Sequence, residues 1–420
     1  MANPVHAHNP VQQDWMPKGD VPAREIALLV GCARSQMDDE HRQQIRDLLS
    51  PPMDWAVLQH LARKHGILPL LYQNLKQAGA DLIDAPVLAE LRRYSQGIAF
   101  QNSVFTRALL NILNLFSAND ILALPFKGAV LAASAYNNIS LRSFCDLDIL
   151  IRQQDCLKAV DVLTHQANYR TSREWHFLNE SWELLYRRSY REISLTNGVV
   201  TIDLHQALTV EQYLSTQFSF DELWHHRESI EIAAQSIPIF ATTDLLLYLC
   251  VHASKECWRK LKWICDITEF VHVHPELDWP FLCQQAHILH CERRLLTGLL
   301  LSQTLLDLPL PDVVRQRANQ DQVCYDLAAE FSQRLFWDQN QLDRQFTVEK
   351  FRLHLKSLEN FDDRRLSGEE LIRQLVTLLI KLLPNSEDQK FIPLPQLLYF
   401  LYYVIRPYRL LLKKARSTQE

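Results

Sequence analysis

Glycine is scarce in this sequence, and its scarcity limits the folds that the chain can adopt. Only 9 of the 420 residues are glycine, against a usual frequency of roughly 7%. Because glycine is the residue that adopts positive φ without strain, few positions can form the tight turns that join many short strands. The composition therefore argues against a turn-rich all-β fold and favours a chain with many helices.

The spacing of apolar residues predicts helices in both flanks of the chain. From residue 23 to about 120, apolar side chains recur at helical intervals, as in Trp55, Leu58 and Leu61. Residues 242–420 have the same character, with breaks at prolines, and the length predicts two or three packing units. We expect four parts: a flexible N-terminal arm at 1–22, a helical region at 23–120, a central unit at 121–241 and a C-terminal helical region at 242–420.

The hydrophobic period changes in the central unit, from helical spacing to short apolar runs that are typical of strands. The first run, 121–126, ends at Lys127-Gly128 and is followed by a helix-like segment, and the second run is 147–151. Two further runs, starting at 191 and at 199, meet at Asn197-Gly198, a dipeptide typical of β-hairpins, and 229–240 adds more strand. The sequence predicts an α+β fold in which a small mixed β-sheet lies between helical regions.

Three aspartates of this unit are candidate metal ligands. Asp146 and Asp148 stand two residues apart at the start of a strand, so their side chains project to the same face. Asp203 lies in a hairpin strand and would bring a third carboxylate alongside. Converging carboxylates repel one another unless cations lie between them, and hard oxygen ligands suit Mg²⁺. We predict a magnesium site at these three residues, and expect Asp148→Asn to relieve repulsion in the metal-free protein.

The Lys127-Gly128 turn is a candidate phosphate site. A helix that begins at Ala129 would direct its unpaired N–H groups and its positive dipole end toward an anion. Gly128 would let a phosphate approach the backbone, and Lys127 and Arg142 would add positive charge. The alternatives are structural, with Gly128 capping a turn, Lys127 a solvated charge, and Arg142 paired with Asp146.

His205 shares a strand face with Asp203. It either touches a metal, a substrate or an acceptor hydroxyl as a base, or it bonds its neighbours as a structural histidine.

A long helix is predicted from residue 244 to 271, and a basic stripe lies along one of its faces. The stripe either faces a nucleotide, with Lys255 among the ligands, or is the solvated face of the helix. Trp258, in the same segment, either stacks on a base or packs in the core. The stripe consists of His252, Lys255, Arg259 and Lys262.

The residues around these candidates resemble a known family. The run 125–131, the strand that begins at Asp146 and the segment Ile202-Asp203-Leu204-His205 are similar to the uncharacterised bacterial nucleotidyltransferases of the polymerase-beta-like nucleotidyltransferase superfamily. Upstream, residues 65–72 resemble the helical leader of that family, so the likeness begins at about residue 25. Further matching residues are Tyr136, Arg142, His252, Trp258, Arg259, Leu261, Lys262, Trp263 and Asp266.

The resemblance implies a nucleotidyltransferase palm with its reaction. In such enzymes the aspartates hold two Mg²⁺ ions, an acceptor hydroxyl attacks the α-phosphate of an NTP such as ATP, and pyrophosphate leaves. The acceptor would be a small molecule, a protein or an RNA end. The turn departs from the superfamily pattern, because Ala129 follows Gly128 where serine or glycine is usual. Two other readings stay open: a nucleotide-sensing or scaffold protein that keeps the palm, and a two-metal phosphohydrolase.

Charge and cysteine usage narrow the setting of the protein. The formal net charge is −5, so no global basic field indicates nucleic-acid binding. The nine cysteines form no C-x-x-C pair, and we expect reduced, mostly buried thiols in a cytoplasmic protein. No signal peptide is visible, and the apolar stretches are shorter than the ~20 residues of a spanning helix. The segment 399–416 is expected to pack on the core, with contact to an anionic membrane surface as the weaker alternative.

Overall fold

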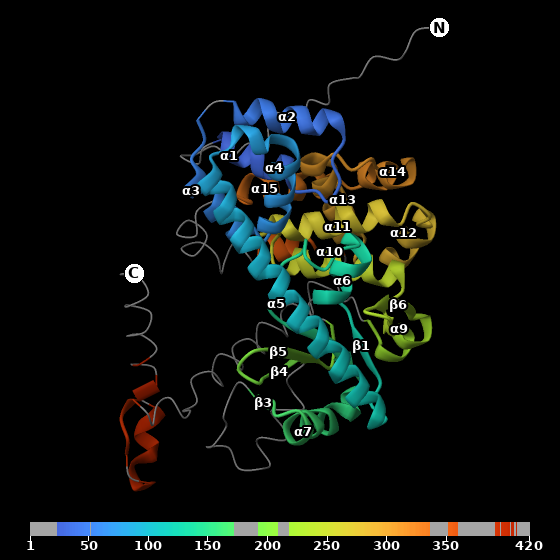
Figure 1. Cartoon of the computed structure of the whole chain (residues 1–420). Coiled ribbons are helices and arrows are strands. Elements are labelled where there is room, and N and C mark those ends of the chain that lie inside the picture. Colours follow the sequence, from blue (N-terminus) through green and yellow to red (C-terminus); the bar gives the residue numbers. More distant parts are fainter. Residues whose placement is uncertain are drawn as a thin grey trace.

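The computed structural model in Figure 1 describes residues 23–50, 52–171, 192–208, 218–336 and 352–359, and residues 391–409 without 395, 404, 407 and 408. The helices of residues 23–79 and 242–334 lie together at one end of the molecule, and the five-stranded sheet lies at the other (Figure 1). The predicted arm at 1–22, residue 191 and most of the segment 399–416 lie outside the described residues.

The main sheet is mixed and has the order β1-β2-β5-β4-β3. The central strands β2 and β5 run parallel, and the other neighbouring pairs are antiparallel. With helical regions before and after it, this mixed sheet confirms the predicted α+β class. The strands are β1 (Ala123–Pro125), β2 (Leu147–Ile151), β3 (Arg170–Thr171), β4 (Glu192–Thr196) and β5 (Thr201–His205).

Apolar and polar residues alternate in β5, and in β2 Asp148 is the one polar residue among apolar ones, so the two faces of the sheet differ. Leu147, Ile149, Ile202 and Leu204 point to one face and belong to a buried cluster with α5 (Ala85–Ala118) and α7 (Cys156–Gln166). Asp148, Asp203 and His205 therefore project from the opposite face, on the side away from these helices. The alternation that builds the core thus also presents the polar residues together.

Helices make up both flanks. Before the sheet come α1 (Ala23–Gly31), α2 (Asp39–Leu49), α3 (Trp55–His65), α4 (Leu68–Gly79), the 3₁₀ turn η2 (Ala80–Leu82) and α5. Within the central unit lie α6 (Gly128–Tyr136), η3 (Gln153–Asp155), α7 and α9 (Phe220–His226). After it come α10 (Thr242–Lys255), α11 (Leu261–Val273), α12 (Trp279–Ile288), α13 (Glu292–Leu306), α14 (Asp312–Gln320), α15 (Gln322–Arg334) and η4 (Gln396–Leu401).

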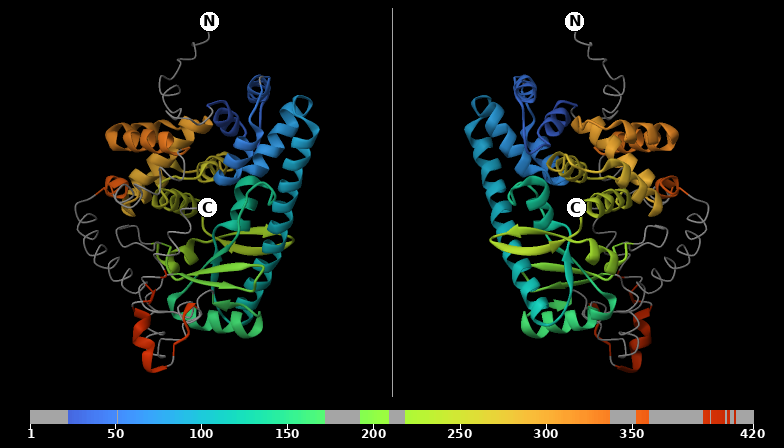
Figure 2. Two further views of the ribbon diagram at one scale, coloured as in Figure 1. Left: turned by 90° about the vertical axis from the view of Figure 1, so that its left-hand side faces the viewer. Right: turned by 90° about the vertical axis from the view of Figure 1, so that its right-hand side faces the viewer.

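The two flanks share one hydrophobic core. Ile26 and Leu71 from the early helices belong to the same buried cluster as Leu249, Leu299 and Phe331 from the late ones. A second cluster lies under the sheet, and α5 contributes to both clusters along its length. In Figure 2 this long helix runs beside the whole body from the helical end to the sheet. The central unit is therefore inserted between two halves of one helical core.

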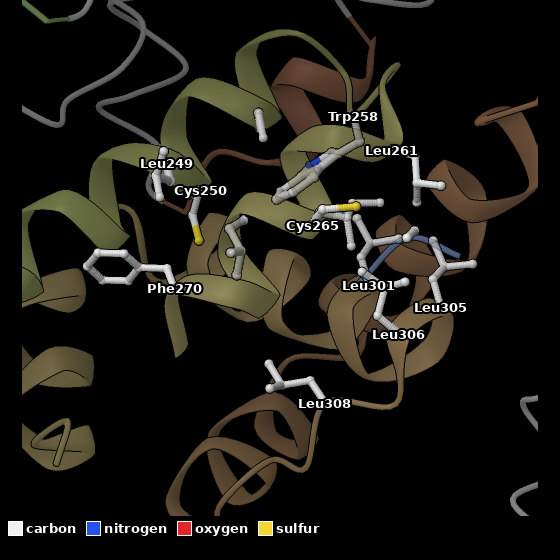
Figure 3. Packing of buried hydrophobic residues seen from close by; sticks show 14 of the residues in the cluster. Leu249, Cys250, Trp258, Leu261, Cys265, Phe270, Leu301, Leu305, Leu306 and Leu308 are labelled. Carbon is white, nitrogen blue, oxygen red and sulfur yellow. The ribbon is translucent and has the colours of Figure 1, made fainter. Parts of the chain in front are cut away.

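The helix predicted from 244 to 271 is two helices in the structure, so that prediction was wrong in its middle. The helix α10 ends at Lys255, and Cys257 and Trp258 adopt left-handed backbone conformations with φ 52° and 53°. The Trp258 ring is 1% exposed and packs over Gly298 of α13, where a Cβ would lie 2.7 Å from the ring. Figure 3 shows this ring among buried leucines and cysteines, which supports the packing role over base stacking. The basic stripe is thereby divided between two helices.

Shorter predictions are confirmed in position. The strands β4 and β5 form the hairpin around Asn197-Gly198, with Thr196 paired to Thr201 and Gly198 at φ 89°. The strand signal at 229–240 forms β6 (Glu228–Ile232) and β7 (Gln235–Ile239), which make a separate two-stranded sheet.

All nine cysteines lie in the described ranges, where none of them forms a disulfide, and seven of them are buried. In the part of the chain that the structure describes, none of the helices combines the length and the apolar character that crossing a membrane requires.

Candidate active site

The parallel register of β2 and β5 brings two of the predicted aspartates side by side. Asp148 pairs with Asp203 across these strands, so both side chains project from the same face of the sheet. Ser194 of β4 is next in the same row and hydrogen-bonds the Asp203 carboxylate. Asp146 stands two residues before Asp148, directly ahead of β2. The sheet thus gathers the three carboxylates at one end of its polar face.

The pKa values show that these carboxylates lie within electrostatic reach of one another. Burial, with smaller contributions from the negative charges of Glu192, Asp148 and Asp146, raises the pKa of Asp203 to about 6. The pKa of Asp146 is also raised, first by burial and then by Asp148. Burial is the larger cause for both residues, and repulsion between the carboxylates adds to it.

Lys127 forms an ion pair with the innermost of these carboxylates. Its Nζ lies 2.7 Å from Asp148 Oδ1, with side chains that are 15% and 4% exposed. Burial alone would raise the pKa of Asp148, but Lys127 and His205 hold it well below its usual range. Burial would likewise lower the pKa of Lys127, but Asp148 raises it above its ordinary value. The charge of Asp148 contributes to the raised pKa values of Asp146 and Asp203, so Asp148→Asn would relieve that repulsion, but it would also break the buried ion pair with Lys127.

Gly128 begins α6 and lies against the Asp146 backbone. Its φ is +53°, and a Cβ built on it would lie 3.3 Å from the Asp146 carbonyl oxygen and 3.5 Å from Phe144 Cδ2. The first turn of α6 has no side-chain cap, so its amides can serve an anion. The predicted phosphate turn and the predicted metal ligands thus meet in space, although the phosphate role itself stays a prediction.

His205 is buried beside Asp148. Its Nε2 lies 3.0 Å from Asp148 Oδ1, and its Nδ1 lies 3.7 Å from a carboxylate oxygen of Glu192 on the neighbouring strand. Because a carboxylate only accepts hydrogen bonds, Nε2 is the protonated nitrogen in this contact. The Phe126 ring meets the imidazole edge-on at 5.1 Å. His205 is therefore placed to orient Asp148.

Arg142 forms a buried ion pair with Asp266, and its predicted role in phosphate binding stays a prediction. Its Nε and Nη2 donate to the two carboxylate oxygens of Asp266 in α11, at 2.7 and 2.9 Å, and its side chain is 5% exposed. The Tyr136 hydroxyl donates to the same carboxylate at 2.8 Å. The structural alternative was wrong in its partner, because Arg142 pairs with Asp266 and not with Asp146. Arg142 ties the loop before β2 to α11.

Comparison with known proteins gives a family for this geometry. A family model described as uncharacterised nucleotidyltransferase matches residues 51–307. The chain belongs to this family. A search of curated proteins finds no match. The matched range contains every candidate residue, from Lys127 to Lys262, and it includes the helical leader before them.

The leader of this nucleotidyltransferase contacts the site region directly. His65 Nδ1, at the end of α3, accepts a hydrogen bond from the backbone N–H of Leu261 at 3.2 Å, at the start of α11. The carbonyl of Gly66 accepts one from Ser143 Oγ at 2.7 Å, in the loop that leads to Asp146. The resemblance at 65–72 therefore reflects packing between distant parts of the chain.

Lys262 is a further candidate, which the sequence placed in the basic stripe and among the residues that match the family. Its Nζ donates to the Ser143 carbonyl at 3.2 Å, and its stem packs over Gly66. Burial and then the charge of Arg142 lower its pKa to about 8, while Asp146 is among the groups that act in the other direction. A stripe signal alone could not distinguish this lysine from its neighbours, because the break after α10 decides which of them turns inward.

Lys255 is the last residue of α10 and lies three residues after His252. The pKa of His252 is lowered, first by burial and then by Lys127, and the charge of Lys255 contributes to the same shift. Lys127 and Lys255 thus both lie within electrostatic reach of His252. The role of Lys255 in nucleotide binding stays a prediction. Arg259, the next member of the stripe, pairs with Glu256 at 2.9 Å.

The donor set suits magnesium in its chemistry, although no ready-made ligand cluster exists. Among the residues within the described ranges, no three His, Cys, Asp or Glu side chains are grouped as a metal site. Asp148 Oδ1 instead contacts Lys127 and His205. The carboxylates of Asp146 and Asp203 carry raised pKa values, so a divalent cation between them would relieve their repulsion. Asp146, Asp148 and Asp203 are the residues that would hold it.

Proposed function

We propose that this family member is a Mg²⁺-dependent enzyme that transfers a nucleoside monophosphate from an NTP to a hydroxyl-type acceptor and releases pyrophosphate. The observation that carries the proposal is the pairing of Asp148 with Asp203 on one sheet face, beside a turn whose Gly128 lies against Asp146. Metal ligands and a phosphate-binding helix start are the two parts that phosphoryl transfer requires.

Each residue has a role in this proposal. The first amides of α6 and the Lys127 ammonium bind the β- and γ-phosphates, and Gly128 lets them approach the backbone. Asp146, Asp148 and Asp203 hold the metal, which when bound neutralises the phosphates and makes the acceptor hydroxyl more acidic. His205 donates from Nε2 to Asp148 and fixes the orientation of that carboxylate.

In this scheme Lys127 changes partner when the nucleotide binds. Without nucleotide its ammonium neutralises Asp148 at 2.7 Å, and it also hydrogen-bonds the Tyr248 hydroxyl. An NTP offers the ammonium a stronger anion at the same turn, so Lys127 is expected to move from the carboxylate to the phosphates. Its departure would leave His205 as the remaining partner of Asp148 Oδ1, so that the carboxylate could also bind a metal.

The test is incubation of the purified protein with each labelled NTP, Mg²⁺ and a lysate. We expect one NTP to label a small molecule, a protein or an RNA end, and pyrophosphate to appear only when acceptor is present. The Asp203→Asn variant should abolish labelling, whereas Asp161→Asn, an exposed change on α7, should not. Nucleotide hydrolysis without acceptor would favour a phosphohydrolase, and no turnover of any NTP would favour a nucleotide-sensing or scaffold protein.

A further inference from the structure

The segment that carries Asp146 is held by side chains from helices outside the sheet. Asp146 precedes β2, and the ladder between β2 and β5 begins only at Leu147. Ahead of it, three successive carbonyls each accept a hydrogen bond from a side chain of a distant element. These bonds run from Asn102 Nδ2 to Arg142 O at 2.9 Å, from Lys262 Nζ to Ser143 O at 3.2 Å, and from Gln101 Nε2 to Phe144 O at 2.8 Å.

Two of the three donors are neighbours on α5. Asn102 is fully buried, and the same Nδ2 also donates to the carbonyl of Ile139 at 2.6 Å. Gln101 is exposed on the surface of the helix, and its amide reaches back to the loop. A buried amide without hydrogen-bond partners would cost free energy. The two bonds from Asn102 Nδ2 therefore stabilise both the side chain and the loop.

The held segment packs directly on the candidate phosphate turn. Phe144 and the Asp146 carbonyl are the nearest atoms to the position of a Cβ on Gly128, at 3.5 and 3.3 Å. A shift of the segment would therefore change the distance between the turn and the Asp146 carboxylate. Asp148 and Asp203 do not depend on these contacts in the same way, because the backbone ladder of the sheet fixes them.

We propose that Gln101 and Asn102 of α5 are positioning residues, which set Asp146 at the distance from the Lys127-Gly128 turn that metal and phosphate binding require. This inference rests on the proposed function. The long helix thereby becomes part of the active-site machinery, although it contributes no group that touches substrate. Residues that orient metal ligands from behind typically change metal affinity by 10–100-fold when they are removed.

The experiment measures Mn²⁺ binding by electron paramagnetic resonance, with no nucleotide turnover needed, and NTP turnover as a function of Mg²⁺ in parallel. The variants are Gln101→Ala and Asn102→Ala, and the matched control is Gln96→Ala, which removes an exposed glutamine from the same helix. Because Gln101 is exposed, its variant is expected to fold even where Asn102→Ala does not.

We expect Gln101→Ala to weaken Mn²⁺ binding about 10-fold and to raise the Mg²⁺ concentration for half-maximal turnover by a similar factor. Its melting temperature in EDTA should match that of Gln96→Ala. If wild type binds Mn²⁺ and Gln101→Ala binds it equally well, the positioning role is refuted while the proposed function stands. If wild type binds no Mn²⁺ with or without NTP, the proposed function is refuted and the positioning role with it.

Discussion

Replacing each of two neighbouring aspartates by asparagine should change stability in opposite directions. Asp148 and Asp203 are paired in register on the same sheet face, and the two replacements are equal in size. Asp148, however, has Lys127 at 2.7 Å, with side chains only 4% and 15% exposed. Among the residues that the structure describes, no cation forms an ion pair with Asp203, and its pKa is raised to about 6. The signs of the two effects follow from this difference.

The Asp148→Asn change leaves the Lys127 ammonium buried without its counter-ion. Breaking a buried pair by removing one partner costs about 3–5 kcal/mol, and at about 2 °C per kcal/mol the melting temperature should fall by roughly 5–10 °C.

The Asp203→Asn change removes a charge that burial and three neighbouring carboxylates disfavour. A pKa that rises from 3.8 to about 6 corresponds to an upper limit of about 3 kcal/mol. We reduce that limit to about 1–2 kcal/mol, because Asp203 is partly exposed and water screens it. The variant should therefore be more stable than wild type at pH 8 by that amount.

The stability difference between Asp203→Asn and wild type should depend on pH. Its folded-state pKa lies above its unfolded value, so the folded state binds the proton more tightly and the wild type loses stability as pH rises through about 6. The advantage of Asp203→Asn should be largest at pH 8 and vanish below pH 4.

The assay is thermal unfolding in EDTA at several pH values, with the exposed Asp161→Asn as control. A metal-free Asp148→Asn protein as stable as wild type would refute the pairing of Lys127 with Asp148. The Lys127→Met/Asp148→Asn double variant should recover part of the loss, since it buries neither charge alone.

Three further outcomes are expected. Gly128→Ala should cost about 1 kcal/mol or more, because φ is +53° and the new Cβ would lie 3.3 Å from a carbonyl oxygen; unchanged melting and an unchanged KM for NTP would contradict this. Burial lowers the pKa of His65 to about 3, so the unfolded state binds a proton that the folded state excludes. The stability of the wild type should therefore fall as pH drops below about 6.5, by up to about 1.4 kcal/mol per pH unit. In pH-dependent melting, His65→Asn should show a flatter profile. Cys145 is the exposed cysteine, so a maleimide should modify it first and Mg²⁺ with NTP should slow the reaction, as peptide mass spectrometry can measure; equal rates would place the nucleotide elsewhere.

Local patterns were sufficient to predict most of the sheet and its polar row. The alternation in 201–205 and the single polar residue of the apolar run 147–151 indicate which residues face the core, and the Asn197-Gly198 turn determines the hairpin register. What the strands could not reveal is that β2 and β5 would be parallel neighbours with Asp148 opposite Asp203, because that depends on the crossover between them.

Partners of the charged residues were beyond the reach of sequence patterns. Arg142 and Asp266 are far apart in the chain, and only the packing of α6 against α11 brings them together. The same holds for Lys262, which turns inward because Cys257 and Trp258 take left-handed conformations and interrupt the helix. Helical spacing cannot foresee a break whose cause is the burial of one large ring against Gly298.

The shared core of the two flanks has a consequence for synthesis on the ribosome. Apolar residues of the early helices, such as Ile26 and Leu71, belong to one buried cluster with residues of α10 to α13. At roughly 5–20 residues per second, those partners emerge on the order of tens of seconds later. We expect the apolar faces of the early helices to stay exposed while the central unit is synthesised. Limited proteolysis of stalled nascent chains should therefore cut these helices until α13 has left the exit tunnel. Protection of the early helices from proteolysis before α13 emerges would mean that they pack together without the late helices.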